Sequence, residues 1–119
     1  MKPSAGIILL LGGKVLLLQG LSGIWSFPKG HGEDYDLTPI DTAVREMEEE
    51  TGYRLNIDYE IVGDAIRLDK KFYWHARPLR SLRKPTLDAK EHKDCRWVPV
   101  EDLAWFNTNG GVRVWARRL

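Results

Sequence analysis

Apolar residues open the chain in two short blocks separated by a polar turn. Residues 7–11 and 15–18 are aliphatic, and Gly12-Gly13-Lys14 interrupts them. Short apolar runs bounded by glycines are typical of strands. We therefore expect two strands joined by a Gly-Gly turn rather than the unbroken apolar core of a signal peptide, and no clear small-residue cleavage site follows.

Apolar positions then change from a strand-like to a helical spacing between residues 38 and 52. Thr38 is suited to the N-cap of a helix, Pro39 to its first position and Asp41 to the third residue after the cap. Gly52 is suited to closing the helix. The stripe that would face the core consists of Ile40, Ala43, Val44 and Met47.

The second half of the chain alternates between strand patterns and turns. Residues 55–68 are mostly strand-like, Asp69-Lys70 is a hairpin tip, and residues 71–79 form a second strand. In that second strand we expect one face to carry Phe72, Trp74 and Ala76, and the other, polar face to carry Tyr73, His75 and Arg77.

Shorter elements are expected in the last third of the sequence. Residues 80–88 read as a loop, 95–98 as a short strand ended by Pro99, and 100–105 as a brief helical turn. Thr108 or Asn109 would cap a last helix that runs to about Arg118.

Composition adds limits on the class of protein. With 119 residues, 43% of them apolar, the chain is expected to form one soluble domain over residues 1–119. The net charge of +1 argues neither for nor against nucleic acid. The lone cysteine, Cys95, suits a reducing compartment such as the cytoplasm, and no stretch is long enough to span a membrane.

Four glutamates crowd the end of the expected helix. Glu46, Glu49 and Glu50 stand at i, i+3 and i+4 and so share one face, where like charges repel each other. A bound divalent cation would remove this repulsion, because magnesium takes carboxylate oxygens as ligands. The alternative is a solvated acidic face. Asp41 and Arg45 are four residues apart and are expected to pair.

The segment from Gly30 to Tyr53 resembles the signature box of the Nudix hydrolases. That box is a glycine, five residues, a glutamate, seven residues, then Arg-Glu, an aliphatic, any residue, Glu-Glu, any residue, glycine and an aliphatic. Residues 45–52 match its helical half fully. Its loop half departs from the pattern, because Asp36 replaces the glutamate, one additional residue follows, and Tyr35 stands where glycine is common.

The resemblance implies an α+β fold, a Nudix-type α/β/α sandwich with a mixed sheet. It also implies a pyrophosphohydrolase in which water attacks phosphorus with the help of Mg²⁺ or Mn²⁺. By this resemblance Glu49 and Glu50 are metal ligands, and Glu46 is a ligand or the base that activates water. Arg45 would orient the cluster through ion pairs.

Residues outside the helical half are implicated in the same way. The carbonyl of Lys29 or Gly30 would add a metal ligand, and the Lys29 ammonium would meet phosphate or be solvated. His31 would contact phosphate or support its loop, and Tyr73 would stack on a base or be structural. Glu91, far beyond the box, is expected to supply a metal-site carboxylate from across the cleft.

Two short patches and one basic span indicate the substrate. Residues 25–31 resemble an element of diadenosine tetraphosphate and diphosphoinositol polyphosphate hydrolases, and Glu91-His92 followed by Arg96-Trp97 resembles another of the tetraphosphate enzymes. Residues 67–84 hold seven Lys or Arg against one acid. This span is either a solvated hairpin and loop or, if it lies beside the carboxylates, a surface that attracts a polyanion. The hypotheses are a dinucleoside polyphosphate hydrolase, an enzyme acting on RNA 5′ ends or inositol pyrophosphates, and a non-catalytic nucleotide-binding module; oligomeric state is not predicted.

Overall fold

A seven-stranded sheet carries the helices of this protein. The computed structural model describes residues 2–119. The strands are β1 (Ala5–Leu11), β2 (Lys14–Gly20), β3 (Trp25–Ser26), β4 (Lys29–Gly30), β5 (Tyr59–Leu68), β6 (Lys71–Pro78) and β7 (His92–Pro99). The helices are α1 (Pro39–Thr51), the 3₁₀ helix η1 (Val100–Trp105) and α2 (Gly110–Arg117).

Strand β1 lies at the centre of the sheet. It runs parallel to β6 on one side, from the pair Ala5–Phe72 to the pair Leu9–Ala76. On its other side it is antiparallel to β4 near its start and to β2 near its end. Strands β5, β3 and β7 extend the sheet through antiparallel pairs with β6 and β2. The sheet is therefore mixed, as expected.

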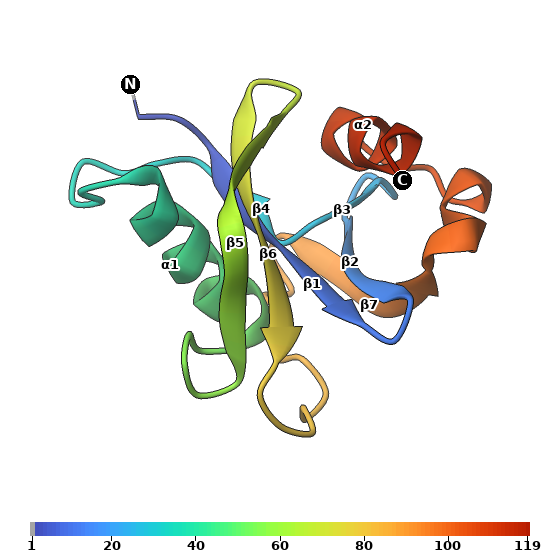
Figure 1. The fold of residues 1–119 in the computed structure, drawn as a ribbon, viewed down its shortest axis with the longest axis horizontal. Helices are drawn as coiled ribbons and strands as arrows, with labels where there is room; N and C mark the ends of the chain where they lie inside the picture. Colours follow the sequence, from blue (N-terminus) through green and yellow to red (C-terminus); the bar gives the residue numbers. More distant parts are fainter. Residues whose placement is uncertain (1) are drawn as a thin grey trace.

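Helices cover both faces of the sheet (Figure 1). Ile7 and Leu9 of β1 pack with Ala43 and Met47 of α1 in one core cluster. Ile8 between them belongs to the other cluster, which includes residues of η1 and α2. Because alternate residues of a strand point to opposite faces, a strand buried on both sides reads as an unbroken apolar run. The predicted α+β sandwich is confirmed.

Helix α1 begins and ends where the sequence predicts. The backbone N–H of Thr38 donates to the Asp41 carboxylate at 3.0 Å, and Gly52 closes the helix with φ +81°. The expected pair between Asp41 and Arg45 is wrong, because Asp41 is engaged by Thr38 and the Arg45 guanidinium bonds elsewhere. At the other end of the chain, the Asn109 side chain accepts from the Val112 N–H and so caps α2.

Two strand boundaries differ from the sequence prediction. Residues 56–58 form a turn rather than part of a strand, because the Asp58 carboxylate accepts the Arg54 N–H at 2.8 Å and Asn56 has φ +64°. Strand β5 therefore begins at Tyr59. Strand β7 begins at His92, three residues earlier than expected, because it pairs along almost all of β2.

Tyr73 is fully buried, so its predicted place on a polar face is wrong. Its ring packs edge-to-face on Phe27 with centroids 5.4 Å apart. On the same face of β6, the His75 ring accepts the indole N–H of Trp115 at 3.0 Å. The error arises because β6 is an inner strand whose face at Tyr73 is covered by residues of the core on the α2 side. A buried ring cannot stack on a substrate base.

No helix within residues 2–119 is long and apolar enough to cross a lipid bilayer.

Candidate metal and phosphate site

An open cleft of about 610 Å³ lies beside the C-terminal half of α1. Its walls come from β4, α1, the first residue of β6, the turn after β2 and the start of β7. The side chains that line it are mostly charged: Ser4, Leu21, Lys29, Gly30, His31, Glu33, Glu46, Glu50, Lys71, Glu91 and His92. The structure therefore gathers most of the predicted site residues in one place.

Two helix glutamates, Glu46 and Glu50, form the buried wall of the cleft. Glu50 is only 4% exposed and accepts the backbone N–H of Lys29 at 3.1 Å. Burial raises the pKa of both carboxyls, and the neighbouring Glu46 raises that of Glu50 further. Such a pair is stabilised by an added positive charge, from either a proton or a cation.

The backbone of β4 lies directly against this wall. A Cβ on Gly30 would lie 2.1 Å from the Glu46 carboxyl carbon, so any other residue would displace that carboxylate. Gly30 thus permits the main chain and the acidic side chain to approach each other. This position is consistent with the predicted role of the Gly30 carbonyl beside a cation.

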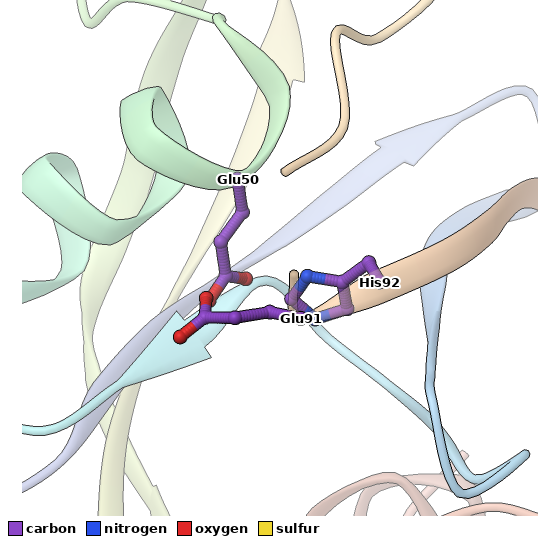
Figure 2. A group of neighbouring side chains, drawn as sticks. All are labelled: Glu50, Glu91 and His92. Carbon is purple, nitrogen blue, oxygen red and sulfur yellow. The ribbon is translucent and has the colours of Figure 1, made fainter. Parts of the chain in front are cut away.

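Glu91 enters the cleft from the opposite direction. It lies just before β7, and its carboxylate points toward that of Glu50 (Figure 2). One ligand atom each from Glu50, Glu91 and His92 lie within 4.8 Å of one another. The predicted location of Glu91 across from the helix is therefore what the structure shows, whereas His92 joins the group unforeseen.

Glu49 differs from the other helix glutamates. Its side chain is 55% exposed, and both carboxylate oxygens bond to the guanidinium of Arg45, at 3.1 and 3.2 Å. It does not line the cleft that holds Glu50 and Glu91. The structure does not bring Glu49 to the group, and its part in metal binding stays a prediction.

Arg45 connects the helix to the loop that precedes it. Its guanidinium bonds to Glu46, to Glu49 and to the carbonyl of His31. It also makes two bonds with Asp36, from Nε to Oδ1 at 3.1 Å and from Nη2 to Oδ2 at 2.9 Å. This bidentate pair is the strongest type of arginine–carboxylate contact.

Asp36 is the functional residue that the sequence left unexplained. It is 4% exposed, and besides Arg45 it accepts the Thr42 hydroxyl at 2.9 Å and the Glu33 N–H at 2.8 Å. Hydrogen bonds from Arg45 hold its pKa far below the usual range. Asp36 thus holds Arg45 from the loop. Its side chain is shorter than the glutamate of the signature box, and the loop is one residue longer than in that box. The departure from the box at this point is the signal that could have drawn attention to it.

Basic side chains stand opposite the acidic wall. Lys29 of β4 and Lys71 of β6 both line the cleft. The pKa of Lys71 is lowered by its partial burial and by the charge of Lys29. Lys71 was not foreseen as a site residue, because only the parallel β1–β6 pairing brings it here. His31 also lines the cleft, with its Nδ1 3.0 Å from the Ser4 hydroxyl.

The donor atoms of this cleft fit a divalent cation. The carboxylates supply the oxygen ligands that Mg²⁺ and Mn²⁺ take. The mutual repulsion of the buried pair Glu46 and Glu50 is a further indication, because a cation would relieve it. Nδ1 of His92 is buried without a hydrogen-bond partner among residues 2–119, which leaves a ring nitrogen available.

The loop between β6 and β7 carries Glu91 as its last residue and is tied to the end of α1; we refer to residues 79–91 as the strap. Arg80 and Arg83 both bond to the buried Asp58, with nearest contacts of 2.7 and 3.3 Å. Arg83 also donates to the Gly52 carbonyl, and the Thr86 N–H donates to the Thr51 carbonyl. The strap therefore ties Glu91 to the end of the helix that carries Glu50.

Four of the seven basic residues in the predicted span are engaged in separate contacts. Arg77 pairs with Glu60, Arg80 and Arg83 pair with Asp58, and Lys71 belongs to the cleft. These arginines have structural partners, so their number alone is no measure of affinity for a long polyanion.

Comparison with known proteins agrees with this geometry. The family model of the NUDIX domain matches residues 1–118, and the chain belongs to this family. It is 43% identical over 56 residues to a candidate hydrolase, 111R, of Invertebrate iridescent virus 3, which covers 47% of this chain and 33% of the viral protein. It is 36% identical over 88 residues to a candidate mutator protein, MutT4, of Mycobacterium tuberculosis. That alignment covers 67% of this chain and 34% of the mycobacterial protein. The chain thus spans about a third of the length of these curated relatives.

Solved structures share the fold at lower identity. A C. elegans Ap4A hydrolase has a TM-score of 0.71 at 24% identity, over 90% of this chain and 86% of that one. An ADP-ribose pyrophosphatase from Streptococcus suis has a TM-score of 0.68 at 21% identity, over 98% and 90%. At these identities the likeness establishes the fold and leaves the substrate to be argued from the cleft.

Proposed function

We propose that this domain is a metal-dependent pyrophosphohydrolase that cleaves a phosphoanhydride bond in a dinucleoside polyphosphate or a related nucleoside polyphosphate. One observation carries the proposal: carboxylates from α1 and from the start of β7 share a cleft with Lys29 and Lys71. Acidic groups suit cations, lysines suit phosphate, and phosphoryl transfer depends mainly on positioning and charge neutralisation. The Ap4A hydrolase among the fold relatives is consistent with this substrate class.

The carboxylates are proposed to hold Mg²⁺ or Mn²⁺, with Glu46, Glu50 and Glu91 as ligands, Glu49 joining them and the Gly30 carbonyl beside them. When bound, the ion neutralises phosphate charge and lowers the pKa of water. Lys29 and Lys71 bind the phosphates, and His31 contacts them from the loop after β4. Where Glu46 is not itself a ligand, it accepts a proton from the attacking water. Arg45 orients Glu46 and Glu49.

The alternative substrates of this class are RNA 5′ ends and inositol pyrophosphates. The small-molecule proposal is favoured because Arg80 and Arg83, which would have to guide a long polyanion, are already paired with Asp58. A purely nucleotide-binding module is less favoured, because it would have no need of a buried, mutually repelling pair of carboxylates.

One substrate panel tests the proposal. Purified protein with Mg²⁺ or Mn²⁺ is given dinucleoside polyphosphates, nucleoside triphosphates, nucleotide sugars, inositol pyrophosphates and triphosphorylated or capped RNA. We expect the highest kcat/KM on a dinucleoside or nucleoside polyphosphate, with no turnover in chelator. A highest kcat/KM on RNA would select the second candidate, and no turnover on any member would contradict enzymatic function.

Substitution of Glu50 or Glu91 by glutamine should lower kcat at least tenfold. Each change keeps the size of the side chain and removes a charge from the cleft. The matched control is Glu48→Gln, one helix position from Glu49, where the side chain is half-exposed and faces Arg54 at 3.6 Å. Glu50→Gln should leave the melting temperature unchanged or higher, because it removes a buried charge. Near-wild-type turnover in both cleft variants at saturating metal would contradict the mechanism.

A further inference from the structure

We propose that His92 supplies an imidazole nitrogen ligand to the divalent cation of this cleft, so that the site binds Mn²⁺ in preference to Mg²⁺. The inference rests on the proposed metal site and deepens it by naming a nitrogen ligand and the ion that suits it. Figure 2 shows the imidazole ring of His92 beside the carboxylates of Glu50 and Glu91.

The position of His92 is fixed by its backbone rather than by its ring. Its N–H donates to the Asp88 carbonyl at 2.9 Å, and the residue pairs with Gly20 at the irregular end of the β2–β7 ladder. The side chain is therefore free to serve another purpose. Its Nδ1 is buried and has no hydrogen-bond partner within residues 2–119. A buried polar atom without a partner is unfavourable, and a metal ion bound at this nitrogen would remove that cost.

The spacing of the three side chains suits a single ion. Ligand atoms from Glu50, Glu91 and His92 lie within 4.8 Å of one another. Oxygen and nitrogen ligands bind first-row divalent ions at about 2.0–2.2 Å, so two ligands of the same ion lie at most about 4.4 Å apart. Small side-chain rotations therefore bring all three onto a common centre.

The mixture of ligands distinguishes between metals. Mg²⁺ takes oxygen ligands almost alone, whereas imidazole suits transition ions. Two carboxylates with one imidazole therefore favour Mn²⁺ over Mg²⁺. The second histidine that lines the cleft, His31, differs because its Nδ1 already faces the Ser4 hydroxyl at 3.0 Å. His31 therefore serves as a matched control.

Pulsed electron paramagnetic resonance of the Mn²⁺-loaded protein tests the ligand directly. A coordinated imidazole gives ¹⁴N modulation of the Mn²⁺ echo, and we expect it in the wild type and in His31→Gln but not in His92→Gln. Equilibrium dialysis should show Mn²⁺ bound at least tenfold more weakly by His92→Gln, with Mg²⁺ binding changed less than threefold. Wild-type protein labelled with ¹⁵N-histidine should lose the ¹⁴N signal even if His92→Gln fails to fold.

Two results would overturn the inference: bound Mn²⁺ without ¹⁴N modulation in the wild type, or modulation that survives in folded His92→Gln. These outcomes are separable from failure of the proposed function. Hydrolysis of the substrate panel without ¹⁴N modulation would refute the nitrogen ligand and leave the pyrophosphohydrolase standing. Modulation that depends on His92, in a protein that hydrolyses nothing, would support the ligand and contradict the enzyme.

Discussion

Asp36 is a single carboxylate on which three parts of the molecule converge. It holds the Arg45 side chain of α1, the Thr42 hydroxyl one turn earlier and the Glu33 backbone of the loop. Because Arg45 in turn bonds to Glu46, the loop sets the orientation of a cleft carboxylate that it does not touch. The arrangement is a positioning device, since Asp36 itself does not line the cleft.

Asp36→Asn should lower both stability and turnover. The change removes a buried charge that faces Arg45, and we expect the free energy of unfolding at pH 7 to fall by about 3 kcal/mol. Turnover should fall while the KM for substrate changes little, because Glu46 loses its support. Urea unfolding and steady-state kinetics measure the two effects. The control is Asp34→Asn in the same loop, whose exposed carboxylate has no ion-pair partner closer than 4 Å within residues 2–119.

The same pair predicts a pH dependence. The pKa of Asp36 in the folded state lies below its unfolded value of about 3.9. The ionised carboxylate therefore stabilises the folded state fully at pH values above that unfolded pKa. This stability should be lost as the pH falls from about 5 toward the folded pKa. The slope of melting temperature against pH in this range should be shallower in Asp36→Asn. Parallel slopes would contradict the assignment.

Sequence alone predicted the residues of the cleft that depend on local spacing. Glu46 and Glu50 follow from helical periodicity, which fixes which side chains share a face. Glu49 was grouped with them by the same rule but pairs with Arg45 outside the cleft. Lys71 and His92 could not be found in that way, because strand pairing between distant segments brings them to the cleft. The burial of Tyr73 depends in the same way on a helix that covers its face of the sheet.

At the scale of elements, the strap fixes the distance between helix α1 and the start of β7. Its contacts with Asp58, Gly52 and Thr51 lie at the end of α1 or just beyond it. The sequence predicts a loop here but not its anchoring, because the partner Asp58 lies in a turn within the segment where the sequence predicts strand. Conversely, the hairpin tip Asp69-Lys70 was predicted correctly, since it depends on neighbouring residues only.

The double variant Arg80→Gln/Arg83→Gln should loosen the strap. Asp58 would remain buried without its ion pairs, so we expect a loss of about 1–3 kcal/mol in unfolding free energy and faster amide hydrogen exchange across residues 79–91. Turnover should fall because the position of Glu91 becomes less defined. Arg77→Gln, which affects an exposed pair with Glu60, is the control.

The outcome also bears on RNA as a substrate. If exchange in the strap is unchanged while binding of triphosphorylated RNA falls and its salt dependence flattens, these arginines serve a polyanion rather than the fold. That result would favour the second candidate function.

At the scale of the whole molecule, β1 belongs to both hydrophobic cores. Ile8 packs on the α2 side and Leu9 on the α1 side, and both are fully buried. Neither core can lose its contribution from this strand without disturbing the other. The mixed sheet that produces this arrangement could be expected from family resemblance but not from periodicity, because the β1–β6 pairing joins distant parts of the chain.

Shortening a β1 side chain on either face of the sheet should therefore destabilise the whole domain in a single unfolding transition. Ile8→Ala and Leu9→Ala should each lower the free energy of unfolding by about 2–5 kcal/mol. Calorimetry should show a single peak in both variants, displaced to lower temperature, with equal calorimetric and van't Hoff enthalpies. Two resolved peaks in either variant would show that the α1 and α2 sides unfold independently.

The central place of β1 has a consequence for how the protein is made. Within this domain the strand is synthesised well before its parallel neighbour β6 and the covering helix α2. Until then the apolar hairpin of β1 and β2 has an unpaired edge and two uncovered faces, which is the kind of surface on which nascent chains associate. The pairing that gives the finished domain its two cores thus leaves an apolar hairpin exposed in the growing chain until β6 and α2 have been synthesised.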